Sequence, residues 1–600
     1  MRDRTVGRFG PLFLVVCLAW PLASFGESPD PAPDLKTLIN APSSELASVV
    51  SRFSADNWAL MRRYDSAPSK DARERRRSFL KSWQKALKAI DATDLGVEGR
   101  IDLVLLENRL AYELGRLDLD EAALQEIAPI IPFAREVVAL QEARRRLEDV
   151  EPQAAAAALV KIRQTVNDVR KAIEGDNESE AGEESAISAT KNDAHLAAAV
   201  VDDLVETLAD WHGHFDGYDP LFSWWTKDPY KQADEALKSY ARFLRQHFLG
   251  DHGHGENGRR DKPVVGLPVG REALMEDLRA AMIPYTPEEL LAIGEREFEW
   301  CDREMRKAAK DLGFDNWKDA LEHVKNLHVE PGQQVSLVRD LAHEAVDFLA
   351  ERDLLTVPPL ATEIWRMRML SPERQKIAPF FLGGETVQVS FPTDTMTHEQ
   401  KLMSMRGNNI HFSRATVHHE LIPGHHLQGF MTERHMPHRR LFYTPFWIEG
   451  WALYWEMRLW DLGFPKTPED RIGMLFWRMH RCARIVFSLK FHLGEMTPAE
   501  AIDYLVERVG HERDNATAEV RRSFEGNYPP LYQLAYMMGA LQFRALHEEL
   551  VVNGEMTEKA FHDGILTGGH MPVEMVRARL KGTLLEPGYA ASWRFADPLP

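Results

Sequence analysis

The sequence predicts a large, mainly α-helical protein with little β structure, for three reasons. Apolar residues recur every three or four positions over long stretches, as on the buried face of a helix. Helix-start sequences precede several of these stretches. Alternation typical of a strand is found only near Thr386–Phe391. The 600 residues, 44% hydrophobic and 28% charged, have a globular composition and suit one large helical enzyme or two to three modules.

The formal net charge of −19 argues against a nucleic-acid partner. Binding to phosphates requires a surplus of Lys and Arg on one face of the protein. We therefore expect a protein that does not bind nucleic acid.

Residues 1–26 are typical of a signal peptide. Three arginines precede an apolar run at 11–22, and Ser24 and Gly26 are the small residues expected before a cleavage point. An uncleaved anchor is the alternative, but the run is shorter than the roughly 20 residues of a membrane span. Cys17 follows Val rather than Gly or Ala, which does not favour a lipoprotein cut. The sequence predicts an exported protein, periplasmic or secreted, with no stable membrane span after cleavage.

The N-terminal half reads as helices interrupted by two polar segments. Leucines of the 34–119 stretch recur at helical spacing, at Leu103, Leu106, Leu110 and Leu114. The acidic segment 174–188 is interpreted as a solvated loop because few apolar residues hold it in place. His252 and His254 lie in a Gly-rich segment, and we interpret this segment as a mobile loop rather than a metal site.

The C-terminal half repeats one helix-start device. In Thr286-Pro287-Glu288-Glu289, Thr can cap, Pro suits the first helical position, and the second Glu can complete a capping box. The same pattern recurs at residues 497–500. Cys301 and Cys482 are the cysteines that remain after signal cleavage, and the sequence leaves open whether they pair.

The most informative stretch is TVHHELIPGHHLQ, residues 416–428, which places four histidines and a glutamate within nine residues. Hydrolytic zinc sites need three protein ligands, an open position and a nearby base. The usual helical form is H-E-x-x-H, in which residues four apart share a face. Here His419-Glu420 is followed by the next histidines six and seven positions later, a spacing that a regular helix cannot bring to one ion.

Pro423-Gly424 offers a solution to this spacing. A two-residue bulge there would make His419 and His425 equivalent to an i, i+4 pair, with His426 as the alternative second ligand. His418 then points elsewhere and is a candidate for supporting the ligands.

The third ligand is expected from a neighbouring helix. Glu449, in the segment WIEGWALYWE, is our candidate. Glu456 is the rival, and its other possible role is to orient a histidine.

These motifs resemble the DUF885 family of bacterial proteins, which is grouped with the zincin-like metallopeptidases. The resemblance covers HHELIPGHHLQ, IEGWALYWE, residues 267–298 and residues 531–546. The spacing from histidine to glutamate is also similar to that of helical gluzincin peptidases. The resemblance implies a two-lobed helical fold with a central cleft, in which His419, His425 and Glu449 hold Zn2+ and Glu420 takes a proton from the zinc-bound water.

Further candidate site residues follow from the chemistry. A glutamate beside a ligand histidine is where a general base is needed, which again indicates Glu420. Tyr536, with Tyr528 behind it, is our candidate to stabilise an oxyanion, although a core tyrosine is an equal alternative. Arg544, eight positions after Tyr536, is a candidate for binding a substrate carboxylate.

We accordingly divide the chain into a signal peptide (1–26), an N-terminal helical region (27–262) and a zinc-binding catalytic region (263–600), with the two regions packed as one large unit. The predicted activity is that of an exported zinc metallopeptidase acting on short peptides, carboxypeptidase-like or dipeptidase-like. The alternatives are a zinc hydrolase of non-peptide amides or esters, and a non-catalytic binding protein of the same fold. The sequence leaves the oligomeric state open.

Overall fold

The computed structural model describes residues 34–41, 43–174, 187, 189–250, 264–375, 381–526 and 528–596. The predicted signal peptide, most of the acidic segment and the two histidines of the Gly-rich segment lie outside these residues. The chain divides into a small unit, residues 1–42, and a large unit, residues 43–600. The small unit contains α1 (Leu35–Ile39), whose first turn is capped by the Asp34 side chain.

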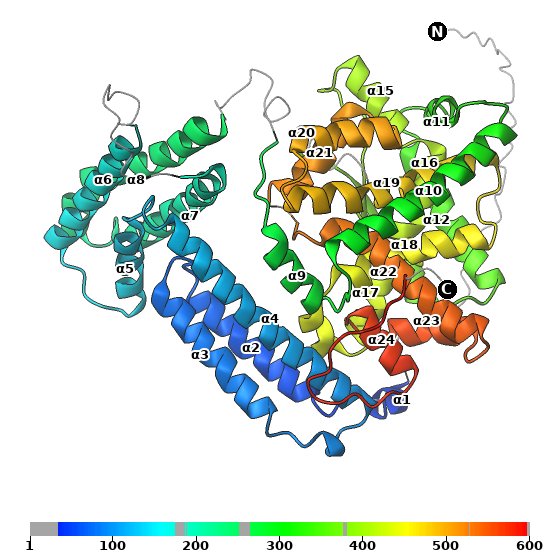
Figure 1. Cartoon of the computed structure of the whole chain (residues 1–600), viewed down its shortest axis with the longest axis horizontal. Coiled ribbons are helices and arrows are strands. Elements are labelled where there is room, and N and C mark those ends of the chain that lie inside the picture. Colours follow the sequence, from blue (N-terminus) through cyan, green and yellow to red (C-terminus); the bar gives the residue numbers. More distant parts are fainter. Residues whose placement is uncertain are drawn as a thin grey trace, which may run out of the picture. The chain divides into compact units, whose positions relative to one another are not determined.

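The predicted mainly α-helical class is confirmed for the large unit. Its first seven helices, coloured blue to green in Figure 1, are α2 (Ala47–Arg63), α3 (Lys70–Leu87), α4 (Val97–Ile127), α5 (Ala134–Arg145), α6 (Pro152–Glu174), α7 (Lys191–Phe215) and α8 (Pro220–Leu249). Helices α6 and α7 both pack against α8 and bury one apolar core, to which Leu159, Leu204 and Leu237 contribute.

The helices that follow are α9 (Gly270–Ala280), α10 (Pro287–Asp311), α11 (Trp317–Lys325), α12 (Gln334–Glu351), α13 (Pro359–Ile364), α14 (Pro372–Gln375), α15 (His398–Gly407), α16 (Ile410–Glu420), α17 (His425–Arg434), α18 (Pro445–Asp461), α19 (Pro468–His492), α20 (Pro498–Tyr504), α21 (Arg513–Phe524), α22 (Tyr532–His547), α23 (Glu558–Leu566) and α24 (Val573–Leu580). Helix α18 lies against α22, and α19 packs against α10, α16 and α22 (Figure 1). These contacts build the core that surrounds the candidate site.

Both predicted capping boxes are confirmed. The Thr286 hydroxyl accepts a hydrogen bond from the Glu289 backbone N–H at 3.3 Å, and the Glu289 carboxylate accepts one from the Thr286 N–H at 2.8 Å. Thr497 and Glu500 make the same pair of bonds at the start of α20. Local chemistry therefore fixes where these helices begin.

The described β structure is one two-stranded parallel sheet. The predicted strand is confirmed as β2 (Thr386–Val389), and it pairs with β1 (Arg366–Met369). The sequence RMRM of β1 alternates exposed arginines with half-buried methionines, but it is only four residues long and has no β-branched or aromatic residue, so it was not predicted as a strand.

One apolar core extends over α2–α4 and over the C-terminal helices, from Leu46 to Ala596. Buried ion pairs reinforce this connection. Arg439 Nε donates to Asp102 Oδ1 at 2.7 Å, and His438 Nε2 lies 2.7 Å from Asp102 Oδ2. The predicted boundary at residue 262 stays a prediction.

Two further features bear on the predictions. Among the helices of the described ranges, none has both the length and the apolar character needed to cross a membrane. Cys301 on α10 and Cys482 on α19 are buried free thiols.

Candidate metal centre

The histidine-rich segment folds as two helices with a break between them. Helix α16 ends at Glu420 and α17 begins at His425, so the structure replaces the expected bulge in one helix with a four-residue turn. Gly424 is required there because a Cβ atom would lie 1.8 Å from the His419 carbonyl oxygen. The Ile422–Pro423 peptide bond is cis. The turn brings the rings of His419 and His425 to 4.8 Å between centroids, at 90° to each other.

Glu449 on α18 completes a group of three possible metal ligands with His419 and His425, whose ligand atoms lie within 4.8 Å of one another. Glu449 Oε2 is 3.2 Å from His425 Nε2 and 3.6 Å from His419 Nε2. Two ligands at about 2.0–2.1 Å from one tetrahedral zinc ion lie about 3.4 Å apart. The two separations from Glu449 are close to this value, and the structure itself carries no ion.

The two rival ligands have other partners. His426 Nε2 lies 2.7 Å from the Ala361 carbonyl oxygen. Glu456 Oε1 accepts a hydrogen bond from His419 Nδ1 at 2.7 Å. This bond fixes the orientation of the His419 ring and leaves its Nε2 atom facing Glu449, as a metal ligand needs.

His418 does not support the ligands as expected. Its imidazole is buried edge-on against Phe464, with ring centroids 5.6 Å apart. Neither ring nitrogen has a hydrogen-bond partner among the described residues. Burial lowers the pKa of His418 to about 4, so it is a neutral core residue near pH 7.

The charges of the group are strongly coupled. Burial lowers the pKa of His419, but the nearby carboxylates of Glu449 and Glu456 outweigh burial and raise that pKa to about 9. Burial raises the pKa of Glu449, but its contacts with His425 and His419 bring that pKa well below its usual value. A histidine must be neutral to bind a metal, so a cation that binds this group would have to displace the proton of His419.

Glu420, the predicted base, lies outside the ligand group and forms no ion pair with another described residue. Its pKa is raised by burial, against the opposing effect of His419 and His425. The loop before β2 packs on it: Gly384 N–H donates to the Glu420 carbonyl at 3.3 Å. A Cβ atom on Gly383 would lie 2.1 Å from Glu420 Oε2. Glycine at position 383 thus leaves room for the Glu420 carboxylate.

Helix α22 brings tyrosines to the group. The Tyr536 ring is 7% exposed and stacks near His419, with centroids 6.2 Å apart. Sequence reasoning missed Tyr532, whose hydroxyl donates to Glu449 Oε1. The signal was the spacing of Tyr532 and Tyr536, since residues four apart share a helix face.

The expectation for Arg544 is wrong. Arg544 is exposed on α22, whereas Tyr536 is buried. Eight residues advance a helix by about 80° beyond two full turns, which is enough to move a side chain from the core to the surface.

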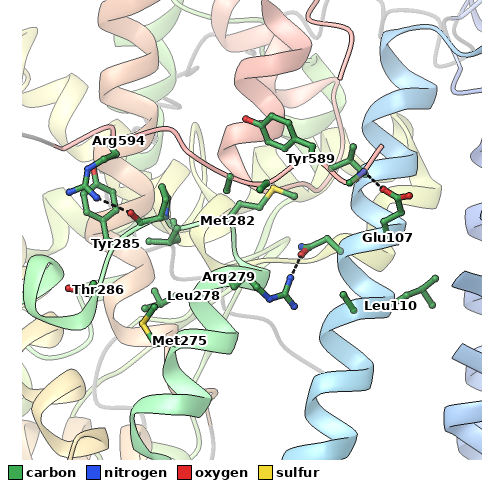
Figure 2. Close-up of a pocket in the computed structure, with 18 of the residues that line it drawn as sticks. Glu107, Leu110, Met275, Leu278, Arg279, Met282, Tyr285, Thr286, Tyr589 and Arg594 are labelled. Atoms are coloured by element: carbon green, nitrogen blue, oxygen red, sulfur yellow. Dashed lines mark hydrogen bonds between the residues drawn. The ribbon is translucent and has the colours of Figure 1, made fainter. Parts of the chain in front are cut away.

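A cavity of about 710 Å³ lies elsewhere in the large unit (Figure 2). Helices α4 and α9 and the C-terminal segment line it, with Leu110, Leu278 and Tyr589 among the residues drawn. The Gly588 N–H donates to Glu107 at 2.8 Å and so holds the segment against α4. None of its lining residues belongs to the ligand group, and the chemistry of the metal centre rests on the buried group alone.

Comparisons with known proteins extend over most of the chain. The model of a family described as "Bacterial protein of unknown function (DUF885)" matches residues 56–580. A candidate lipoprotein of unknown function from Shewanella oneidensis has a similar structure, with TM-score 0.62 and 18% identity, covering 90% of this chain and 100% of that chain. A candidate lipoprotein from Colwellia psychrerythraea has TM-score 0.54 and 16% identity, covering 90% and 98%. At these identities the likeness shows the fold alone. No curated protein matches the chain significantly.

Proposed function

The chain belongs to the DUF885 family, and we propose that it is an exported zinc-dependent metallopeptidase that hydrolyses short peptides, carboxypeptidase-like or dipeptidase-like. The observation that carries the proposal is the buried group of His419, His425 and Glu449, whose ligand atoms are spaced for one tetrahedral zinc ion. Two histidines and a glutamate are a ligand set of catalytic zinc sites, which keep a fourth position open.

Each neighbouring residue has a part in this proposal. Zinc, when bound, supplies Lewis-acid activation of water and of a substrate carbonyl. Glu456 holds the His419 ring through its 2.7 Å bond, and Tyr532 holds the second oxygen of Glu449. Glu420 is the general base, because burial raises its pKa toward the range in which a carboxylate accepts a proton efficiently at neutral pH. Tyr536 is proposed as the donor to the oxyanion.

The fold and location belong to the same proposal. We propose a two-lobed, zincin-like arrangement with a central cleft, since the helix carrying His419 and the helix carrying Glu449 pack against each other as such a site requires. The signal-like residues 1–26 support export to the periplasm or the medium, and the description of both structural neighbours as candidate lipoproteins supports export as well.

The test combines metal analysis with peptide hydrolysis. We expect about one zinc per chain in purified protein, and loss of zinc in a His425→Ala variant. Glu420→Gln should keep the metal and lower kcat on a short-peptide library by about 10²–10⁴-fold, the usual contribution of a general base. The proposal is wrong if purified protein holds no stoichiometric metal, or if Glu420→Gln hydrolyses peptides at the wild-type rate.

A further inference from the structure

We propose that Arg484 and Arg522, beside the metal centre, bind the C-terminal carboxylate of the substrate; this rests on the proposed function and narrows it to cleavage near a free carboxyl terminus. The two guanidinium groups reach the tyrosine side of the centre from different helices, α19 and α21. The Arg484 guanidinium lies 4.5 Å from the centre of the Tyr536 ring, and the Arg522 guanidinium lies 5.3 Å from that of Tyr528.

A third guanidinium, that of Arg481, also lies near Tyr536, at 4.8 Å from the ring centre. Arg484 Nε donates to Glu519 Oε1 at 2.7 Å, and Arg522 Nε lies 2.7 Å from Glu519 Oε2 without the alignment of a hydrogen bond. Arg481 is 3.8 Å from Glu456, which already accepts from His419. The Glu519 carboxylate is thus shared by Arg484 and Arg522, and the Arg481 guanidinium has only the more distant Glu456 carboxylate.

Two donor atoms remain without a partner as a result. Arg481 Nε and Arg484 Nη1 are buried and have no hydrogen-bond partner among the described residues. A buried donor without a partner destabilises the folded protein, and a charged donor does so more strongly. Such atoms beside a candidate catalytic centre indicate that an acceptor joins them when the centre is in use.

The charge balance also favours an anion. Without a cation, the three guanidinium groups lie among four carboxylates, those of the buried Glu449, Glu456 and Glu519 and of the partly exposed Glu420. A divalent cation in the ligand group turns this near balance into a positive excess. A carboxylate from the substrate would neutralise the excess, and its two oxygens match the planar guanidinium geometry.

The arginines become more accessible with distance from the ligand group. The Arg484 side chain is 3% exposed, whereas the Arg522 side chain is 11% exposed and Tyr528 beside it is half-buried. Tyr528 contacts Tyr532, with ring centroids 4.3 Å apart, and Tyr532 in turn binds Glu449. A carboxylate would therefore enter at Arg522 and Tyr528, with the peptide bond to be cleaved lying toward Glu449.

The test uses two N-acetylated tripeptides that differ only in a free carboxylate or an amide at the C-terminus. For zinc-loaded wild-type protein, we expect kcat/KM to be about 10–100-fold higher for the free acid than for the amide. This is the range expected for the loss of a hydrogen bond to a charged group. Arg522→Gln and Arg484→Lys should each lower this preference about tenfold, mainly through KM. Arg513→Gln, on the same helix as Arg522 but exposed and paired with Asp503, is the matched control and should keep the preference.

A binding measurement separates this inference from the peptidase proposal. Isothermal titration of N-acetylphenylalanine and of its amide into the Glu420→Gln variant should show tighter binding of the acid, and Arg522→Gln should remove the difference. Hydrolysis of acid and amide at equal efficiency, or equal binding of both probes, would overturn the carboxylate site while leaving a peptidase. Absence of hydrolysis with selective binding of the acid would refute the peptidase and keep the carboxylate site.

Discussion

Replacing Glu456 with glutamine removes the negative charge behind His419 but keeps an oxygen that can accept the Nδ1 hydrogen. The Glu456 carboxylate accepts this bond at 2.7 Å in a fully buried setting, so the substitution changes charge with little change in shape. If His419 binds zinc through Nε2, the basicity of its ring and hence the zinc affinity depend on this carboxylate.

The magnitude follows from the kind of bond that is lost. A hydrogen bond to a charged group contributes about 1.5–3 kcal/mol and a neutral one about 0.5–1.5 kcal/mol. The difference of roughly 1.4 kcal/mol corresponds to a tenfold weaker zinc affinity. Glu456→Ala leaves Nδ1 without an acceptor and should approach the upper end of the roughly 10–100-fold range known for such supporting residues.

Protons compete with zinc for His419, and Glu456→Gln weakens this competition. This raises the apparent zinc affinity and so opposes the loss described above. The pKa of His419 is raised to about 9, so zinc must displace a proton below that pH, and the apparent affinity rises with pH up to about 9. Glu456→Gln lowers this pKa, so the rise should stop at a lower pH. At pH 7 the two effects partly cancel, whereas above pH 9 only the tenfold loss remains.

The assay is competition with a fluorescent chelator in zinc-buffered solutions from pH 6 to 9.5, starting from metal-stripped protein. Glu433→Gln, an exposed glutamate on α17, is the control and should match wild type. The zinc affinity of Glu456→Gln can instead reach the same maximum as that of wild type, and stop rising at the same pH. In that case Glu456 does not support a zinc ligand and the reasoning fails.

Two more substitutions test other parts of the structure. Gly383→Ala should lower kcat at least tenfold and leave the zinc content unchanged. The new Cβ atom would lie 2.1 Å from Glu420 Oε2 and must displace the carboxylate of this base. An unchanged kcat would show that the loop moves instead. Glu558 has its pKa lowered to about 2, because the bonds to His547 and Arg458 outweigh burial. The stability that the Glu558 carboxylate contributes is present above its ordinary pKa of 4.5 and is lost as pH falls toward 2. Allowing for solvent screening of this half-buried group, Glu558→Gln should lower the free energy of unfolding by on the order of 1–2 kcal/mol at pH 7. In urea unfolding, this difference from wild type should vanish near pH 2. A stability difference that stays constant from pH 7 to pH 2 would contradict this assignment.

The features that local chemistry determines were predictable from the sequence. Thr286 and Glu289 cap a helix through bonds that span three residues, and the structure contains them. Pro423-Gly424 interrupts a helix wherever it occurs, so the approach of His419 and His425 could be anticipated, although the form of the interruption could not. The family resemblance was confirmed over residues 56–580.

The features that depend on distant elements were not predictable in the same way. Glu449 and Glu456 lie two helical turns apart on α18, and only the packing of α18 on α16 decides which carboxylate faces which histidine nitrogen. Gly383 and Arg484 reach the centre from a loop and from another helix, at positions that no local pattern marks. Their roles become visible only after the fold is known.

The contacts between the first helices and the last residues of the large unit restrict the order in which the protein can fold. Arg100 Nη1 donates to the Leu585 carbonyl at 3.1 Å across 485 positions of sequence, and Arg579 Nε donates to Glu98 at 2.7 Å across 481 positions. A chain made from its N-terminus therefore cannot satisfy the buried groups of α4 until nearly all of it has been synthesised. Contacts this distant in sequence slow folding, which leaves the chain in an unfolded state for longer during synthesis. This delay suits the export that we propose, because a chain that crosses a membrane before it folds has to stay unfolded until then.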